Sequence, residues 1–255
     1  MRQILNIDPK NYAKKSLGQN FIHNKYFLKK LSDLILTDDN TDIIEIGPGK
    51  GALTEFLLKK NFSTLYMIEK DINLYHLLKD KYENEKNIKI FNIDALKFDY
   101  KKISGKQKAI IVGNLPFNIS SQLLIKWISG KEWPPFYSKM YLMFQSEVGQ
   151  RIIAKKDTKE YGKISVLTQS RCLVRKIIHA PSNIFHPKPK VNGLVIEFIP
   201  SKKHLDMDFE FLQKITKCAF EKRRKKIRNS LEAFSEYFEN WDQKKDLRPE
   251  NLEVD

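Results

Sequence analysis

Three short segments that could bind a ligand each follow an apolar, β-branched run. "EIGPGKGA" (45–52) holds Gly47, Gly49 and Ala52 in the pattern G-x-G-x-x-[GA], which permits a tight turn and a close approach of ligand to backbone. Glu69 ends the next run and Asp94 the one after it. Carboxylates there can accept ribose hydroxyls and reach an adenine. The pattern predicts a nucleoside pocket; the alternative is a structural turn with two helix caps.

Two nucleoside cofactors fit this pattern. NAD requires a helix N-terminus that holds its pyrophosphate. S-adenosylmethionine has no phosphate, only a ribose, an adenine and a charged amino-acid tail. The glycine segment alone leaves both open.

The segment "GNLPFNIS" (113–120) follows a fourth apolar run and contains no Cys, His or carboxylate. Such a site suits methyl transfer to the exocyclic amine of adenine, whose lone pair is delocalised and whose proton becomes acidic only after transfer. The Asn114 side-chain oxygen and the Leu115 carbonyl can hold the two N–H bonds and aim the lone pair. Pro116 fixes the loop, and Phe117 offers a ring for stacking. A plain strand-to-helix turn is the alternative.

The elements that would position these segments alternate between strand and helix. Strand patterns cover 42–47, 64–71, 87–94, 108–114 and 139–145, and helix patterns include 24–36, 52–60 and 120–129, the last with a Ser as its N-cap. This alternation predicts a mostly parallel α/β sheet. Runs 171–180 and 193–200 have no helix between them, so we expect them to pair antiparallel. We expect a domain at 1–200 with a basic N-terminal arm, and a helical domain at 201–255.

Composition narrows the classes of protein further. The chain has 255 residues, 41% of them hydrophobic, and a net charge of +15, which favours nucleic acid as a partner, although a lysine-rich composition alone would give the same charge. No run approaches the ~18 apolar residues of a membrane span, and no signal peptide is recognised, so a cytoplasmic protein is expected. Cys172 and Cys218 should be reduced thiols, and the histidines show no metal-ligand spacing.

A basic segment near the C-terminus is the second candidate binding surface. Arg223, Arg224, Lys225, Lys226 and Arg228 stand within six positions, and on a helix they would cover more than one face. A solvated basic helix is the alternative. We expect an RNA phosphate-binding surface formed by Arg223, Arg224, Lys225 and Arg228, together with Lys188 and Lys190 in the Pro-rich loop 181–192.

Taken together, these segments resemble the rRNA adenine N6-dimethyltransferases, and within that family the enzymes that modify 16S rRNA. The resemblance extends from Lys15 to Leu252, and its most specific parts are "GQNF" and "NLPF". The matching blocks are "KSLGQNFI", "EIGPGKGALTE", "IEKD", "NIDALKF", "GNLPFNIS", "FQSEVGQRIIAK", "YGKISVLTQ", "FHPKPKVNGLVI", "AFEKRRKKIRNSL" and "LRPENL".

The resemblance implies a Rossmann-like class I methyltransferase that uses S-adenosylmethionine, with a helical C-terminal domain. Its implied substrate is two adjacent adenosines near the 3′ end of 16S rRNA in the immature 30S subunit, and a monomer is expected. The catalytic segment would be Asn114, Leu115, Pro116 and Phe117, with Phe185 as a second ring against the target base. The implied cofactor-binding residues are Asn20, Ile22, Gly47, Glu69, Asp94 and Asn114.

The sequence departs from the family where Phe117 replaces a common Tyr and Ile22 a common Leu. Relatives often continue beyond "RPENLEVD", so we expect a trimmed helical domain. Three other functions stay open: a 23S rRNA methyltransferase of the macrolide-resistance type, an NAD-dependent dehydrogenase, and a non-catalytic assembly factor on the same fold. The blocks "AFEKRRKKIRNSL" and "LRPENL" favour the 16S enzyme.

Overall fold

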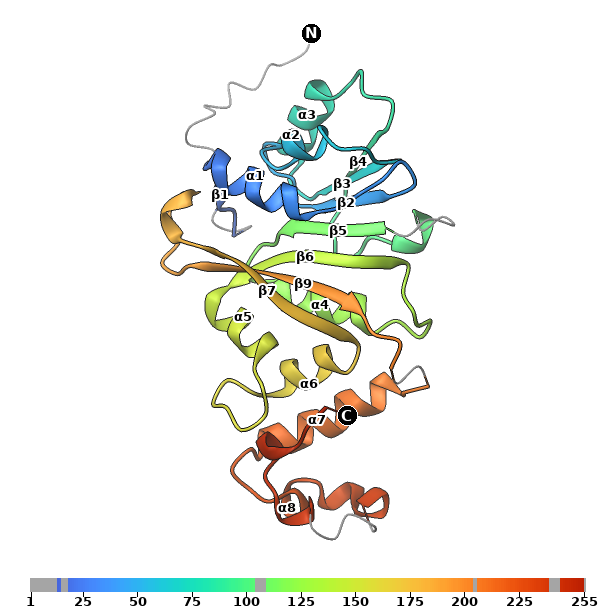
Figure 1. Cartoon of the computed structure of the whole chain (residues 1–255), viewed down its shortest axis with the longest axis vertical. Helices are drawn as coiled ribbons and strands as arrows, with labels where there is room; N and C mark the ends of the chain where they lie inside the picture. Colours follow the sequence, from blue (N-terminus) through green and yellow to red (C-terminus); the bar gives the residue numbers. More distant parts are fainter. Residues whose placement is uncertain (1–12, 15–17, 104–108, 204–205, 239–243, 255) are drawn as a thin grey trace.

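The computed structural model describes residues 13–14, 18–103, 109–203, 206–238 and 244–254 (Figure 1). Most of the expected basic N-terminal arm lies outside these residues. No helix in the described ranges is both long and apolar enough to cross a membrane. Both cysteines are free, as predicted, with Cys172 buried and Cys218 half-buried.

A seven-stranded sheet organises the chain, with strand order β4-β3-β2-β5-β6-β9-β7. Strands β2 to β6 pair in parallel, whereas β9 pairs antiparallel with both β6 and β7, which confirms the predicted mixed sheet. The order reverses at β2, which lies between β3 and β5, and such switch points are where open α/β sheets bind ligands. The strands are β2 (Asp42–Ile46), β3 (Leu65–Glu69), β4 (Ile88–Asn92), β5 (Ala109–Asn114), β6 (Tyr137–Gln145), β7 (Cys172–Ala180) and β9 (Gly193–Pro200).

Helices cover both faces of the sheet because the parallel strands are apolar on both faces. One face packs Ile44, Ile111 and Leu142 against α4 (Ser120–Ile128), α5 (Ser146–Ile153) and α6 (Lys163–Gln169). The other packs Ile43 and Met67 against α1 (Lys25–Leu34), α2 (Thr54–Leu57) and α3 (Ile72–Lys81).

Two predicted helix details are wrong. The helix expected over 52–60 is a single α-turn, because the backbone after it tightens into i→i+3 bonds such as Lys60 N–H to the Leu57 carbonyl (3.0 Å). The Ser expected as N-cap of α4 does not cap it. Ile119 holds that position without a side-chain bond, and Ser120 Oγ donates back to the Phe117 carbonyl (3.2 Å).

A small second sheet was not predicted. The two-residue strand β1 (Phe21–Ile22) pairs antiparallel with β8 (Phe185–His186). A backbone bond from the N–H of His23 to the carbonyl of Ile184 (3.0 Å) extends this contact. The pairing joins the N-terminal segment to the Pro-rich loop 181–192, more than 150 residues away in the chain.

The C-terminal part is helical, as predicted, and lies at one end of the molecule (Figure 1). It consists of α7 (Phe209–Glu221), α8 (Ile227–Ser230) and 3₁₀ turns at Glu232–Phe238, Lys244–Asp246 and Pro249–Asn251; two more lie at Tyr100–Lys102 and Ser182–Ile184. Ala219, Ile227 and Leu231 form a separate small core, whereas Phe209 packs into the core of the large sheet. The domain boundary at residue 200 stays a prediction.

Candidate active site

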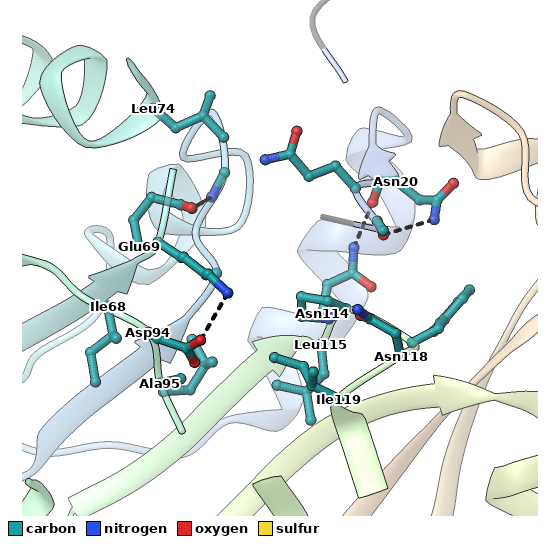
Figure 2. Close-up of a pocket in the computed structure, with 18 of the residues that line it drawn as sticks. Asn20, Ile68, Glu69, Leu74, Asp94, Ala95, Asn114, Leu115, Asn118 and Ile119 are labelled. Atoms are coloured by element: carbon teal, nitrogen blue, oxygen red, sulfur yellow. Dashed lines mark hydrogen bonds and ion pairs between the residues drawn. The ribbon is translucent and has the colours of Figure 1, made fainter. Parts of the chain in front are cut away.

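A pocket opens at the carboxyl edge of the parallel strands (Figure 2). Residues from the ends of β2, β3, β4 and β5 line it, together with the segment that precedes β1. Most of the predicted site residues meet here: Asn20, Gly47, Glu69, Asp94, Asn114, Leu115, Pro116 and Phe117. The sheet and the segment before β1 thus bring together side chains that are up to 97 positions apart in sequence.

The glycine turn after β2 is built from Gly47, Gly49 and Gly51, all with positive φ (63°, 61° and 80°). A Cβ on Gly51 would lie 2.7 Å from Tyr82 Oη, and one on Gly49 would lie 2.9 Å from the Phe21 ring. A Cβ on Gly47 would meet nothing within 4 Å, so this turn leaves open space for a ligand beside its backbone. Gly51 adds a third left-handed glycine to the predicted pattern. Ala52, the expected last position of the pattern, is half-buried against the core on the α1 side of the sheet.

Glu69 ends β3 and is 5% exposed. Its two carboxylate oxygens accept from the N–H of Gly49 (3.1 Å) and the N–H of Asp71 (2.8 Å). Burial raises the pKa of Glu69 to about 7, although these two N–H donors favour the ionised form. The N–H bonds fix the carboxylate, and each oxygen keeps a further lone pair for a hydroxyl.

Sequence reasoning missed a second buried carboxylate, Glu45, in the middle of the apolar run "DIIEI". Burial raises its pKa to about 7, the hydroxyl of Thr54 donates to it (2.7 Å), and the nearby Glu69 raises it further. A lone carboxylate in a strand buried on both faces was the available signal. Glu45 lines a neighbouring pocket that shares Gly47 and Asn114 with the first.

Asp94 lies two residues beyond β4 and caps the turn that follows, accepting from the N–H of Leu96 (2.9 Å). It also pairs with Lys70 at 2.8 Å (Figure 2). Burial opposes ionisation, but the Lys70 ion pair and the Leu96 N–H outweigh it, so the pKa of Asp94 is lowered. Asp94 is therefore an ionised acceptor that lines the pocket.

Asn114 is oriented by the backbone of the N-terminal segment. Its Nδ2 donates to the carbonyl of Asn20 at 2.8 Å (Figure 2). Because a carbonyl only accepts, the NH₂ end of the amide must face Asn20, and Oδ1 remains as the acceptor. The role of Asn114 as an acceptor for an amine stays a prediction.

The three residues after Asn114 present different groups. Leu115 is 1% exposed and its side chain packs in the core, so the predicted use of its carbonyl by a ligand stays a prediction. Pro116 and Phe117 are half-buried and line the pocket. The loop thus presents the rings of Pro116 and Phe117 to the pocket that the Asn114 amide also lines.

Two predicted residues lie outside this pocket. Ile22 lines the neighbouring pocket with Phe21 and Glu45. Phe185 is 2% exposed and packs in the core on the α1 side of the sheet, because its pairing with Ile22 in the small sheet draws it inward. Its exposed neighbour His186 lines the neighbouring pocket instead.

The basic segment near the C-terminus does not form the expected helix. α7 ends at Glu221 and α8 begins at Ile227, so the residues between them form a turn. Arg223 points inward: it bonds Glu250 (2.5 Å) and the carbonyls of Lys159 (2.7 Å) and Thr158 (3.1 Å). The exposed members are Arg224, Lys225, Lys226 and Arg228, of which Lys226 and Arg228 pair with Asp246 (3.0 and 3.1 Å). Lys188 and Lys190 in the Pro-rich loop are exposed as well.

Solved structures define the class of this fold. A dimethyladenosine transferase from Plasmodium falciparum has a TM-score of 0.79 to this chain at 23% identity, covering 92% of this chain and 93% of that one. The 23S rRNA methyltransferase ErmE gives a TM-score of 0.65 at 21% identity, covering 84% of each chain. The fold is therefore that of the Rossmann-like methyltransferases.

Sequence comparison identifies the family. The family model described as ribosomal RNA adenine dimethylase matches residues 10–252. Ribosomal RNA small subunit methyltransferase A from Pelagibacter ubique is 39% identical over 95% of this chain and 93% of its own length. The Bartonella tribocorum protein of the same name is 40% identical over 86% of this chain and 80% of its own. The chain belongs to the ribosomal RNA adenine dimethylase family of methyltransferases.

Proposed function

We propose that this protein uses S-adenosylmethionine to dimethylate N6 of two adjacent adenosines near the 3′ end of 16S rRNA during small-subunit maturation. The observation that carries the proposal is the Asn114 amide, whose NH₂ end is held by the Asn20 carbonyl while its oxygen remains an acceptor. The same pocket contains the carboxylates of Glu69 and Asp94.

The residues present fit S-adenosylmethionine. Glu69 would accept hydrogen bonds from the ribose hydroxyls, and Asp94 would accept one from the adenine amine. The space beside Gly47, which has no side chain, would let the cofactor approach the backbone there. The amino-acid tail would extend toward the neighbouring pocket, where Ile22 lies. When bound, the cofactor supplies an electrophilic methyl group.

The loop after β5 would position the target amine. The Asn114 oxygen and the Leu115 carbonyl would accept its two N–H bonds, which favours a more pyramidal nitrogen with its lone pair aimed at the methyl group. Phe117 would stack on the flipped base. A stacking role for Phe185 requires that β8 turn its ring out of the core.

RNA binding would use the exposed cations. Arg224, Lys225 and Arg228 lie at the helical end of the molecule, and Lys188 and Lys190 lie in the loop after β8, close in sequence to the pocket-lining His186. These two groups are separated along the long axis (Figure 1). We propose that they contact different stretches of rRNA backbone, and that residues 201–255 act as the RNA-binding helical domain.

The choice of small-subunit rRNA rests on the relatives. Both curated relatives are named as small-subunit methyltransferases and match most of this chain. The fold is shared with a 23S rRNA methyltransferase as well, so the fold alone does not separate the two substrates.

The test is methyl transfer from labelled S-adenosylmethionine to immature 30S subunits and, in parallel, to 23S rRNA. We expect label in 16S rRNA and N6,N6-dimethyladenosine after nuclease digestion. Label in 23S rRNA alone would refute the assignment. Calorimetry should show binding of S-adenosylmethionine and of its demethylated product, but not of NAD, and the opposite preference would favour a dehydrogenase.

A further inference from the structure

Residues 18–22, here called the strap, cross the carboxyl edge of the sheet from the β3 side to the β5 side. On the β5 side, the Asn20 carbonyl accepts from Asn114. On the β3 side, Gln19 Nε2 donates to Asp71 Oδ2 (3.3 Å). The strap therefore lies between the proposed ribose carboxylate and the proposed catalytic amide, and adjacent residues of the strap bond to the two sides.

Asp71 is the anchor on the β3 side. Its side chain is 0% exposed, and it is absent from the residues described as lining the pocket. It accepts from Gln19 and from Lys14 Nζ (3.0 Å), while its own N–H donates to Glu69 (2.8 Å). One residue thus contacts both the strap and the carboxylate that would hold the ribose.

We propose that Asp71 is a positioning residue for methyl transfer. It holds the Gln19 side chain, and through the backbone of Gln19 and Asn20 it restrains the Asn20 carbonyl that orients Asn114. A loose strap would release the Asn114 NH₂ end and misalign the acceptor oxygen, and small misplacements at a reacting centre cost large factors in rate. This inference rests on the proposed role of Asn114.

A simpler role for Asp71 is the cap of α3, since Oδ1 also accepts from the N–H of Asn73 (3.0 Å). The two roles are separable because Asn caps a helix about as well as Asp. With the Asn oxygen kept on Asn73, its NH₂ group would face the NH₂ group of Gln19. Asp71→Asn therefore preserves the cap, while it breaks the strap contact and also removes the ion pair with Lys14.

A reversed pair tests the contact directly. In Asp71→Asn, the NH₂ group of the Asn faces the NH₂ group of Gln19, so two donors meet. In Gln19→Glu, two carboxylates face each other and repel. In the double variant, the Glu carboxylate at position 19 can accept from the Asn NH₂ group at position 71. At saturating cofactor and 30S subunits, we expect each single variant to lower the single-turnover rate by about tenfold or more. The double variant should recover to within about threefold of wild type, since residues in contact are not additive.

Asp208→Asn is the matched control. Asp208 caps α7 by accepting from the N–H of Phe211 (3.0 Å), and it does not contact the strap in the described structure. We expect its rate and thermal midpoint to equal those of wild type. Gln19→Met, which leaves the α3 cap intact, is the second variant if Asp71→Asn unfolds, and its rate should fall by a similar factor.

A readout without activity separates this inference from the proposed function. Hydrogen exchange of the peptide containing 18–22, measured without cofactor, should rise in both single variants and return toward wild type in the double. The role would be overturned if Asp71→Asn showed the wild-type rate and wild-type hydrogen exchange. It would also be overturned if the rate loss in the double variant equalled the product of the losses in the two single variants. If wild type methylates no subunit, the proposed function fails, while the exchange data still decide whether Asp71 holds the strap.

Discussion

The pocket and the basic segment are organised in opposite ways. In the pocket, Gly47, Glu69, Asp94 and Asn114 are far apart in sequence and line one cavity. In the basic segment, neighbours in sequence diverge, since Arg223 bonds the backbone of the 154–162 loop while Arg224 is exposed.

The difference has a structural cause. The carboxyl ends of parallel strands share one edge, so a side chain that follows such a strand has little choice of location. Residues 222–226 instead form a turn between two helices, where each side chain leaves in its own direction. A position at the end of a parallel strand therefore predicts where the side chain lies in the fold. A run of basic residues does not predict which of its side chains are exposed.

The largest expected effect is on the pocket side. Asn114→Ala should lower methyl transfer by about 10²–10³-fold, as for other preorganised polar groups at a reacting centre. The protein should still fold and bind RNA normally, since phosphate contacts supply most of that affinity, and cofactor affinity should fall only modestly. The measurement is the single-turnover rate at saturating cofactor and subunit. A loss under threefold would reduce Asn114 to a turn former and weaken the contrast between the regions.

Glu69 should show the next largest effect. Glu69→Ala should weaken cofactor binding by about 10- to 100-fold, because a charged acceptor contributes about 1.5–3 kcal/mol per bond. Wild-type affinity in calorimetry would remove Glu69 from the site.

The raised pKa of Glu69 adds a pH dependence. Only the ionised carboxylate accepts both hydroxyls, and its pKa is about 7, so wild-type affinity should rise between pH 6 and pH 8. In Glu69→Gln the rise should disappear. A persisting rise would assign the titration to Glu45, whose pKa is also raised to about 7.

Arg223 and Arg224 allow a paired test of the basic segment. Arg223→Ala should destabilise the fold by about 1–3 kcal/mol, since Glu250 and two backbone carbonyls lose a charged partner. Arg224→Ala should leave the thermal midpoint unchanged and reduce the salt slope of subunit binding by about one. Equal thermal midpoints for the two variants would mean that the inward bonds of Arg223 contribute no net stability.

A further prediction concerns Glu45 and the pH dependence of stability. Burial raises the pKa of this carboxyl from its ordinary value of 4.5 to about 7 in the folded protein. Folding therefore favours the protonated form of Glu45. The contribution of this group to the free energy of unfolding is fully present below about pH 4.5 and is lost as pH rises through 7. As pH rises from 5 to 8, Glu45→Gln should therefore gain about 2–3 kcal/mol of stability relative to wild type. Thermal unfolding of both proteins at pH 5 and at pH 8 measures this change. A stability difference between variant and wild type that is the same at both pH values would contradict the raised pKa.

Much of the site could be predicted because it depends on local sequence. The apolar runs before Gly47, Glu69, Asp94 and Asn114 identified four strand ends, and parallel strands place such ends on one edge. The amide, proline and ring of "NLPF" favoured methyl transfer over hydride transfer for chemical reasons that need no coordinates. The antiparallel last strands followed from the absence of a helix between them.

Only the tertiary structure decided the orientation and the bonding partners of individual side chains. The Asn114 amide has a direction because a carbonyl 94 positions away accepts from it, and Asp71 acquires its partners from the strap. Phe185 turns into the core because β8 pairs with β1, and Arg223 turns inward because Glu250 returns to it from the end of the chain. These contacts join distant segments through single hydrogen bonds and two-residue strands, which leave no periodic pattern in the sequence.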